Sequence, residues 1–227
     1  MRKRKWRILS LLLVAVMTLG ILFGCSKDGG EKGSGGKGGK KDTIIIATMA
    51  EPPTLSPTEQ NAIASSYMNA LTFSQLTRMN EDMEMEGALA ESFENTSETE
   101  WVFHLRKGVK FHNGEEMTAD DVVASMNLWL ERCSKAQLIA GSTFAKVDDY
   151  TVTLTVPSAS SDILMVLAAP IQFAAIYPQS VVEAAGPDGI TEYIGTGPYQ
   201  LDEWKPDQYV KLTRYADYQS PAGESSG

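Results

Sequence analysis

The stretch WVFHLRKGVKFHNGEEMTADDV, residues 101–122, combines an alternating segment, a turn and the start of a helix. Alternation places three apolar side chains on one face of a predicted strand: Trp101, Phe103 and Leu105. Gly108 marks a turn, and a second strand is predicted to end at Asn113-Gly114. Residues 101–113 therefore predict a β-hairpin, with a three-residue turn or a bulge that lets Phe111 join the aromatic face.

A helix is predicted directly after this hairpin. Thr118 is a favourable N-cap, and Asp121 occupies the third helical position, where its carboxylate also favours the positive end of the helix. Apolar residues at helical spacing predict its buried side: Val122, Val123, Met126, Leu128, Trp129 and Leu130. Cys133 follows at the helix end, and we interpret it as a packing residue.

Strand and helix patterns continue on both sides of this stretch. A buried strand is predicted over Thr43–Met49, a helix over Asn61–Met79 and a turn at Asn80-Glu81-Asp82. Further elements are a strand over Tyr150–Val156, two short helices after Asp162 and Pro178, and two strands over Tyr199–Trp204 and Tyr209–Tyr215. Because strands and helices do not strictly alternate, the predicted class is α/β (mixed α+β) with a mixed sheet.

The N-terminus has the pattern of an export signal. Five of its first seven residues are Lys or Arg, and Ile8–Phe23 carries no charge. This apolar run of 16 residues is shorter than the roughly 20 that span a membrane as a helix. The run ends Leu22-Phe23-Gly24-Cys25, which resembles the bacterial lipobox, so Cys25 is the predicted lipidation site. Residues 26–42 contain seven glycines and no apolar side chain, which predicts a flexible tether.

The net charge of residues 43–227 argues against nucleic acid as a partner. Residues 1–42 hold 10 of the 20 basic residues but 3 of the 29 acidic ones, which leaves residues 43–227 with 10 against 26, a net charge of −16. We therefore expect no nucleic-acid partner. The sequence has no glycine-rich phosphate loop and no cysteine cluster with metal-ligand spacing, so we expect no cofactor and no metal site.

Catalysis also lacks support from the residue patterns. The two histidines, His104 and His112, both fall on the predicted hairpin and are interpreted as surface positions. No serine has a G-x-S-x-G context, and no carboxylates form a recognisable pair for glycoside chemistry. We predict no catalytic residues. The alternatives to a binding protein are a lipid-anchored structural or adhesive protein and, less favoured, a surface hydrolase.

Four motifs occur along the chain in an order that resembles the family 5 solute-binding proteins, the extracytoplasmic receptors of oligopeptide, dipeptide and nickel ABC importers. They are EPPTLSP, GALAESFE, WVFHLRKGVKFHNGEEMTADDV and IGTGPYQLDEW. The resemblance implies a periplasmic-binding-protein-like fold of type II with two lobes that close on a ligand. It also implies a peptide or small-solute ligand, permease subunits as partners, and a lipid anchor on the extracytoplasmic face of the bacterial cell membrane.

The resemblance further implies that the extended segment after the first strand edges the ligand cleft. In this chain the segment is Glu51-Pro52-Pro53-Thr54. Its backbone groups can bond an extended peptide, although Pro52 and Pro53 have no N–H to donate, and the Glu51 carboxylate can meet a ligand ammonium group. The motif LRKGVKFHNGEEMTADDV and the segment Gly195-Thr196-Gly197-Pro198-Tyr199 are interpreted as scaffold, with glycines that permit tight turns.

Members of this family are about twice as long as this chain. The resemblance divides it into a signal peptide (1–24), lipidated Cys25 with its tether (25–42), part of the first lobe with an inserted subdomain (43–218) and an unstructured tail (219–227). The second lobe is expected to be missing, as in a fragment or a truncated product. We therefore expect the chain alone to bind ligand weakly or not at all.

Overall fold

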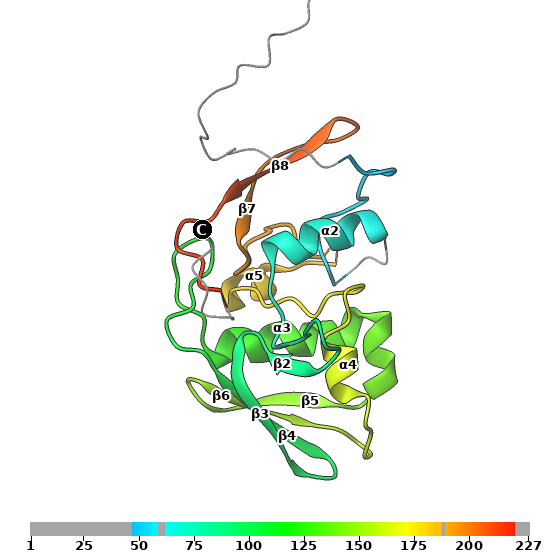
Figure 1. Cartoon of the computed structure of the whole chain (residues 1–227), viewed down its shortest axis with the longest axis vertical. Helices are drawn as coiled ribbons and strands as arrows, with labels where there is room; N and C mark the ends of the chain where they lie inside the picture. The colour runs from blue at the N-terminus through cyan, green and yellow to red at the C-terminus, as the bar shows by residue number, and fades with distance from the viewer. Residues whose placement is uncertain (1–46, 59–61, 188, 221–227) are drawn as a thin grey trace, which may run out of the picture. The chain divides into compact units, whose positions relative to one another are not determined.

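The alternating stretch forms β4 (Glu100–Leu105), a central strand of a four-stranded antiparallel sheet with the order β3-β4-β6-β5. The computed structural model (Figure 1) describes residues 47–58, 62–187 and 189–220, which belong to a unit that begins at Ala47. The other strands of the sheet are β3 (Ala90–Ser97), β5 (Thr143–Asp148) and β6 (Thr151–Thr155). The mixed α/β class is confirmed, but the predicted mixed sheet is wrong, because every strand pair among the described residues is antiparallel.

Several expectations fall outside the described residues. They concern the signal peptide (1–24), Cys25 with the tether (25–42), and the tail from residue 221 onward. The predicted buried strand Thr43–Met49 lies outside them up to residue 46. For residues 47–49 the predicted buried strand is wrong, because these residues belong to no strand and Met49 is fully exposed.

The predicted hairpin over residues 101–113 is also wrong. Phe103 of β4 lies opposite Phe93 of β3 on one side and Val152 of β6 on the other. Val109 and Phe111 are buried in the hydrophobic core, so the residues after Gly108 pack on the sheet instead of extending it. The turns themselves are confirmed, since Gly108 and Gly114 have φ angles of 74° and 88°.

Helix α3 (Ala119–Arg132) covers one face of this sheet (Figure 1). It starts as predicted, with the Thr118 backbone N–H donating to the Asp121 carboxylate over 2.8 Å. Its buried residues include Val122, Ser125, Met126 and Trp129. The Asn127 side chain fixes the helix to β5: it donates to the Phe144 carbonyl over 3.0 Å and accepts the Phe144 N–H over 2.9 Å. Local sequence thus sets where α3 begins, and packing on β5 sets its direction.

Helix α2 (Ile63–Thr72) is shorter than the helix predicted over Asn61–Met79. After Thr72 the chain leaves the helix, and the Leu76 carbonyl accepts the N–H of Ala88 over 2.9 Å. Residues 77–79 then form a strand. The prediction is therefore wrong beyond Thr72, because pairing with residues that follow along the chain replaces the last turns of the helix.

Short elements complete the described chain. Strands β1 (Thr77–Met79) and β2 (Met85–Gly87) pair around the predicted turn at residues 80–82, where the Asn80 side chain accepts the N–H groups of Asp82 and Glu84. The remaining helices are η1 (Ser134–Ile139), α4 (Ile163–Leu167) and α5 (Gln179–Ala184). The short helices after Asp162 and Pro178 are thus confirmed, although the Asp162 side chain makes no cap hydrogen bond.

The last two strands, β7 (Tyr199–Lys205) and β8 (Tyr209–Arg214), form the predicted antiparallel pair. A register shift between Leu201 and Glu203 changes which side chains share a face. One face carries the cross-strand pairs Leu201–Leu212 and Trp204–Val210, and all four of these side chains are half-buried. The hairpin is therefore amphipathic and packs on α2 with β7.

The backbone at Gly195 and Gly197 contacts the end of α2. The Gly197 N–H donates to the Thr72 carbonyl over 2.9 Å, and a Cβ at either glycine would overlap with backbone atoms of α2, namely the Thr72 carbonyl oxygen for Gly195 and the Leu71 carbonyl oxygen for Gly197. Neither glycine has a positive φ. The scaffold interpretation of this motif agrees with the structure, but its glycines allow close approach and not tight turns.

Replacement of a core residue tests the sheet-helix packing. Leu154 of β6 is 0 % exposed, whereas Leu138 of η1 is 66 % exposed. Leu154→Ala is expected to lower the free energy of unfolding by about 2–5 kcal/mol, because it removes buried methyl groups and leaves a cavity. Leu138→Ala, the matched control, is expected to change it by less than about 0.5 kcal/mol. Urea denaturation followed by circular dichroism measures both, and equal losses would contradict the assigned core.

A second prediction concerns the close approach at Gly195. Gly195→Ala is expected to lower the free energy of unfolding by about 1–3 kcal/mol. The added methyl group would overlap with the Thr72 carbonyl oxygen, a backbone atom that cannot move aside as the end of a flexible side chain can. Gly186→Ala is the control, since a Cβ there meets nothing within 4 Å. Thermal denaturation of both variants is the measurement, and a Gly195→Ala protein as stable as the control would show that this contact is not tight.

Candidate functional site

The segment predicted to contact ligand, Glu51–Thr54, lies in the loop that precedes α2. Glu51 and Pro53 are exposed, Thr54 is half-buried and Pro52 is buried. The Thr54 carbonyl accepts the Ser65 hydroxyl of α2 over 2.9 Å, and its side-chain oxygen lies 3.3 Å from the Tyr193 hydroxyl. The segment is therefore fixed at Thr54, on α2 and on the loop that carries Tyr193.

Tyr193 is a residue that the sequence patterns did not single out. It is half-buried, and its sequence separation from Thr54 is 139 residues. Neither a motif nor a spacing rule connects the two positions, so only the folded chain brings them together. The Thr54 side chain also accepts the backbone N–H of Ser56 over 3.1 Å, which fixes the following turn.

The chemistry available at this segment is that of an exposed carboxylate beside a fixed backbone. Among the residues described here, Glu51 has no hydrogen bond or ion pair, so its charge is open to an external cation. The Pro52 ring faces the protein and Pro53 faces solvent. Such an arrangement suits an ammonium group, which a carboxylate binds through charge-assisted hydrogen bonds.

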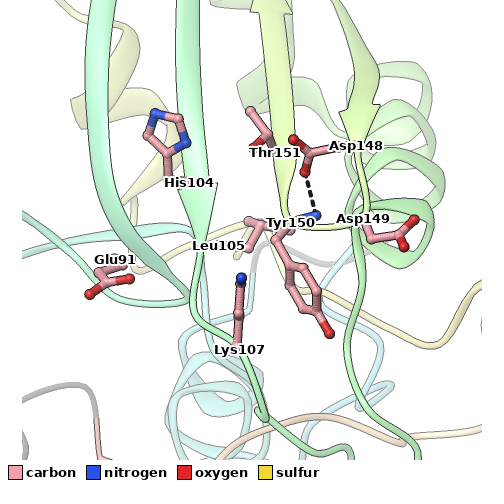
Figure 2. Close-up of a pocket in the computed structure, with 8 residues that line it drawn as sticks. All are labelled: Glu91, His104, Leu105, Lys107, Asp148, Asp149, Tyr150 and Thr151. Atoms are coloured by element: carbon pink, nitrogen blue, oxygen red, sulfur yellow. Dashed lines mark hydrogen bonds between the residues drawn. The ribbon is translucent and has the colours of Figure 1, made fainter.

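A separate hollow of about 470 Å³ opens between β3, β4 and the β5–β6 turn. Figure 2 shows its lining residues: Glu91, His104, Leu105, Lys107, Asp148, Asp149, Tyr150 and Thr151. The Lys107 ammonium group lies 5.2 Å from the centre of the Tyr150 ring. The hollow mixes both signs of charge, and none of the residues Glu51–Thr54 lines it.

Most of the charged groups around this hollow already have partners. Asp148 accepts the Tyr150 N–H over 2.8 Å (Figure 2), which lowers the pKa of its carboxyl group. The Tyr150 hydroxyl donates to Glu116 over 2.7 Å, which lowers the pKa of Glu116 and raises that of Tyr150. Asp149 pairs with Lys146 over 2.8 Å. These contacts explain Asp148, Asp149 and Glu116 as local structure, whereas the exposed Glu91 has no partner among the described residues. The loop before α2 is the stronger candidate because it is the segment that the family resemblance predicts to edge the ligand cleft.

The two histidines differ from each other. His104 is exposed, as interpreted from the sequence, but the surface interpretation of His112 is wrong. His112 is half-buried, and its ring contacts Gly195, Gly197 and Tyr215. Burial lowers the pKa of His112, and the hydrogen bond to the Gly197 carbonyl opposes this effect in part. His112 therefore joins its own loop to residues 195–197 and to Tyr215, which lie far away in the sequence.

The remaining thiol has a structural role. Cys133 is 2 % exposed within the hydrophobic core, and burial raises its pKa, so the packing interpretation agrees with the structure. In the parts of the chain that the structure describes, no group of three or more His, Cys, Asp or Glu side chains is placed to hold a metal ion. No helix among those same residues has the length and apolar character to cross a membrane.

Comparison with known proteins shows which protein family this chain matches. Residues 84–225 match the family described as bacterial extracellular solute-binding proteins, family 5 Middle. The oligopeptide-binding protein AppA of Bacillus subtilis is 28 % identical over 96 % of this chain. The glutathione-binding protein GsiB of Salmonella choleraesuis is 30 % identical over 77 % of it.

Solved structures agree in fold. AppA in complex with a nonapeptide matches with a TM-score of 0.63 and 28 % identity over 75 % of this chain and 36 % of its own. The protein AgaA of A. tumefaciens R10, in complex with agropinic acid, matches with a TM-score of 0.68 and 26 % identity over 74 % of this chain and 35 % of its own. These partial matches agree with the expected periplasmic-binding-protein-like fold and with part of its first lobe.

The chain spans 42 % of the length of AppA and 35 % of the length of GsiB. The family match nevertheless covers more than half of this chain, and it includes the sheet, α3 and the β7–β8 hairpin. On this basis the chain belongs to family 5 of the bacterial extracellular solute-binding proteins.

Proposed function

We propose that this chain is the substrate-binding part of an ABC importer that captures peptides, or a related small solute, outside the cytoplasmic membrane. The family consists of solute-binding proteins, which are non-enzymatic components of transport. The observation that carries the proposal is the family match over residues 84–225, together with the structural similarity to AppA, which was solved with a bound nonapeptide. The partners in this proposal are permease subunits.

Residues Glu51–Thr54 are the proposed ligand contacts. Support comes from the exposure of Glu51 and from the anchoring of Thr54 to α2 and Tyr193. A fixed loop loses little conformational freedom when a ligand binds, which favours affinity. Glu51 would bind the amino terminus of a peptide, while backbone groups beside it bond an extended chain. Closure then depends on contacts made only in the closed state.

The proposed cleft needs a second wall. Relatives are more than twice as long as the part that this chain matches, so in them the rest of the protein is available to close on the ligand. The loop before α2 offers one wall with a single open carboxylate. We therefore propose that the 227-residue chain binds peptide weakly or not at all by itself.

A lipid anchor at Cys25 completes the proposal. It would hold the chain at the outer face of the cytoplasmic membrane, with residues 26–42 as a spacer. One acyl chain gives only marginal membrane binding, whereas two give stable anchoring.

A chimera with AppA tests the proposed function. In it, residues 47–219 of this chain replace the matching segment of the B. subtilis protein, and calorimetry with a nonapeptide measures binding. We expect the chimera to bind and the unmodified 227-residue chain to bind weakly or not at all. Glu51→Gln in the chimera is expected to weaken binding about 10–100-fold, because a hydrogen bond to a charged group contributes about 1.5–3 kcal/mol.

Two controls make this result specific. Glu98→Gln changes another exposed carboxylate, in the turn between β3 and β4, and it is expected to leave affinity unchanged. An N-acetylated nonapeptide is expected to bind the Glu51→Gln and parent chimeras alike. A chimera that circular dichroism shows to be folded but that binds no peptide would contradict the proposed ligand class.

Cys25 offers a separate test of localisation. In a bacterial host supplied with labelled palmitate, Cys25→Ser is expected to abolish labelling and to move the protein from the membrane fraction to the soluble fraction. Cys133→Ser is the matched control, because the chain has two cysteines and Cys133 is buried. Membrane retention of an unlabelled Cys25→Ser protein would overturn the lipid anchor.

A further inference from the structure

His112 joins segments that are far apart in the sequence. Its ring Nε2 lies 2.9 Å from the Gly197 carbonyl oxygen, and the Gly195 N–H donates to its Nδ1 over 3.3 Å. The backbone N–H of His112 also donates to the Gly195 carbonyl over 2.9 Å. The imidazole therefore contacts the same short segment that passes the end of α2 and leads into β7.

The residue that follows β8 closes the other side of this ring. The ring of Tyr215 meets the imidazole edge to face, with 4.9 Å between the ring centres. The Tyr215 hydroxyl donates to the Phe111 carbonyl over 2.7 Å, and its backbone N–H donates to the Pro198 carbonyl over 2.8 Å. Both ends of the β7–β8 hairpin are thus tied to residues 111 and 112.

These contacts fix the protonation state of the ring. A carbonyl oxygen only accepts, so Nε2 must carry the proton that bonds Gly197. Nδ1 accepts the Gly195 N–H, so Nδ1 must be unprotonated. A second proton would place two donors against each other at Gly195, and it would introduce a charge into a half-buried position. The geometry therefore requires a neutral imidazole.

The charged groups near His112 are few. Helix α2 carries no charged residue, and the titratable side chain that touches the ring is Tyr215, which Asp217 influences. On the loop of His112 itself lie Lys110, Glu115 and Glu116. Glu115 accepts from the Asn113 side chain, and Glu116 accepts from Tyr150 and from the Gly108 N–H. The segment before Gly195 carries Glu192, which is exposed, and the hairpin ends contribute Arg214.

We propose that His112 is an acid-sensitive latch that holds the β7–β8 hairpin to the rest of the described unit. In its neutral form the imidazole joins residues 195–197 to residues 111–112. Protonation removes the acceptor at Nδ1, releases the Gly195 N–H and loosens both ends of the hairpin. Binding of a proton at Nδ1 opens the latch, so the latch responds to the pH around the protein. That this is the pH outside the cell rests on the proposed function.

The direction of the pH effect follows from the lowered pKa of His112. The unfolded chain takes up a proton near pH 6.5, whereas the latched form takes it up at a lower pH. The contribution of the latch is therefore complete above pH 6.5. It is lost as the pH falls from 6.5 through the lower pKa of the latched form, which follows because the open state then binds more protons.

The first experiment is nitrogen NMR of the histidine rings in the full 227-residue chain, purified in mild detergent. The chain has two histidines, so His104→Gln assigns the signals without ambiguity. We expect His112 to show the Nε2–H tautomer and a pKa below 6.5. An Nδ1–H tautomer, or a pKa at or above 6.5, would overturn the proposal whether or not any variant folds.

The second experiment measures amide hydrogen exchange at pH 7.5 and pH 5, corrected for intrinsic rates. Protection of β7 and β8 is expected to fall about tenfold for each unit by which the His112 pKa lies below 6.5, up to a limit of about 30-fold at pH 5. Protection of β4 and β6 is expected to stay unchanged, which separates local release from global unfolding. His104→Gln should behave as the parent chain, and His112→Gln should lose the pH dependence. A His112→Gln hairpin with the same pH dependence as the parent would overturn the latch.

Discussion

The described structure depends on a backbone contact that leaves no space for a side chain. Residues 195–197 pass the last turn of α2, and the Gly197 N–H bonds the Thr72 carbonyl there. Any other residue type would place a Cβ against the main chain of the helix. Because β7 follows directly, this contact also sets where the hairpin lies relative to α2. The loop that carries Glu51–Thr54 rests on the same helix through Ser65, so the candidate ligand segment and the hairpin share one support.

Two kinds of interaction stabilise different parts of the described structure. The sheet and α3 enclose a large apolar core around Phe103, Trp129 and Leu154, whose burial scales with apolar area and needs no precise alignment. A smaller apolar cluster around Phe73 and Tyr177 lies beside the α2 contact. The hairpin is joined to this part by the packing of β7 on α2 and by individual hydrogen bonds, each with a net contribution of about 0.5–1.5 kcal/mol. The hairpin is therefore the part that a change of one proton can affect, while the sheet is not.

This division suits a solute-binding protein. A rigid sheet with a capped helix provides a platform, whereas the β7–β8 hairpin, whose strands have no fully buried residue, can adjust at lower cost. At the hollow beside β4 and β6, two of the three lining carboxylates are engaged: Asp148 accepts a backbone N–H and Asp149 pairs with Lys146. Both places present an exposed carboxylate without a partner among the described residues, Glu51 in the loop before α2 and Glu91 at the hollow.

The sequence alone determined the features that depend on residues a few positions apart. The capping box at Thr118 and Asp121, the turns at Gly108 and Gly114, and the β7–β8 hairpin follow from local propensities and hydrogen bonds, and the family motifs identified the fold class. Tertiary structure alone decided which strands pair with β4, where α2 ends, why residues 195 and 197 are glycines, and which residues surround Thr54 and His112. The physical reason is that these contacts join residues from about ten to about 140 positions apart. No local preference encodes which of many apolar or polar partners will meet, because that choice follows from packing the whole chain around one core.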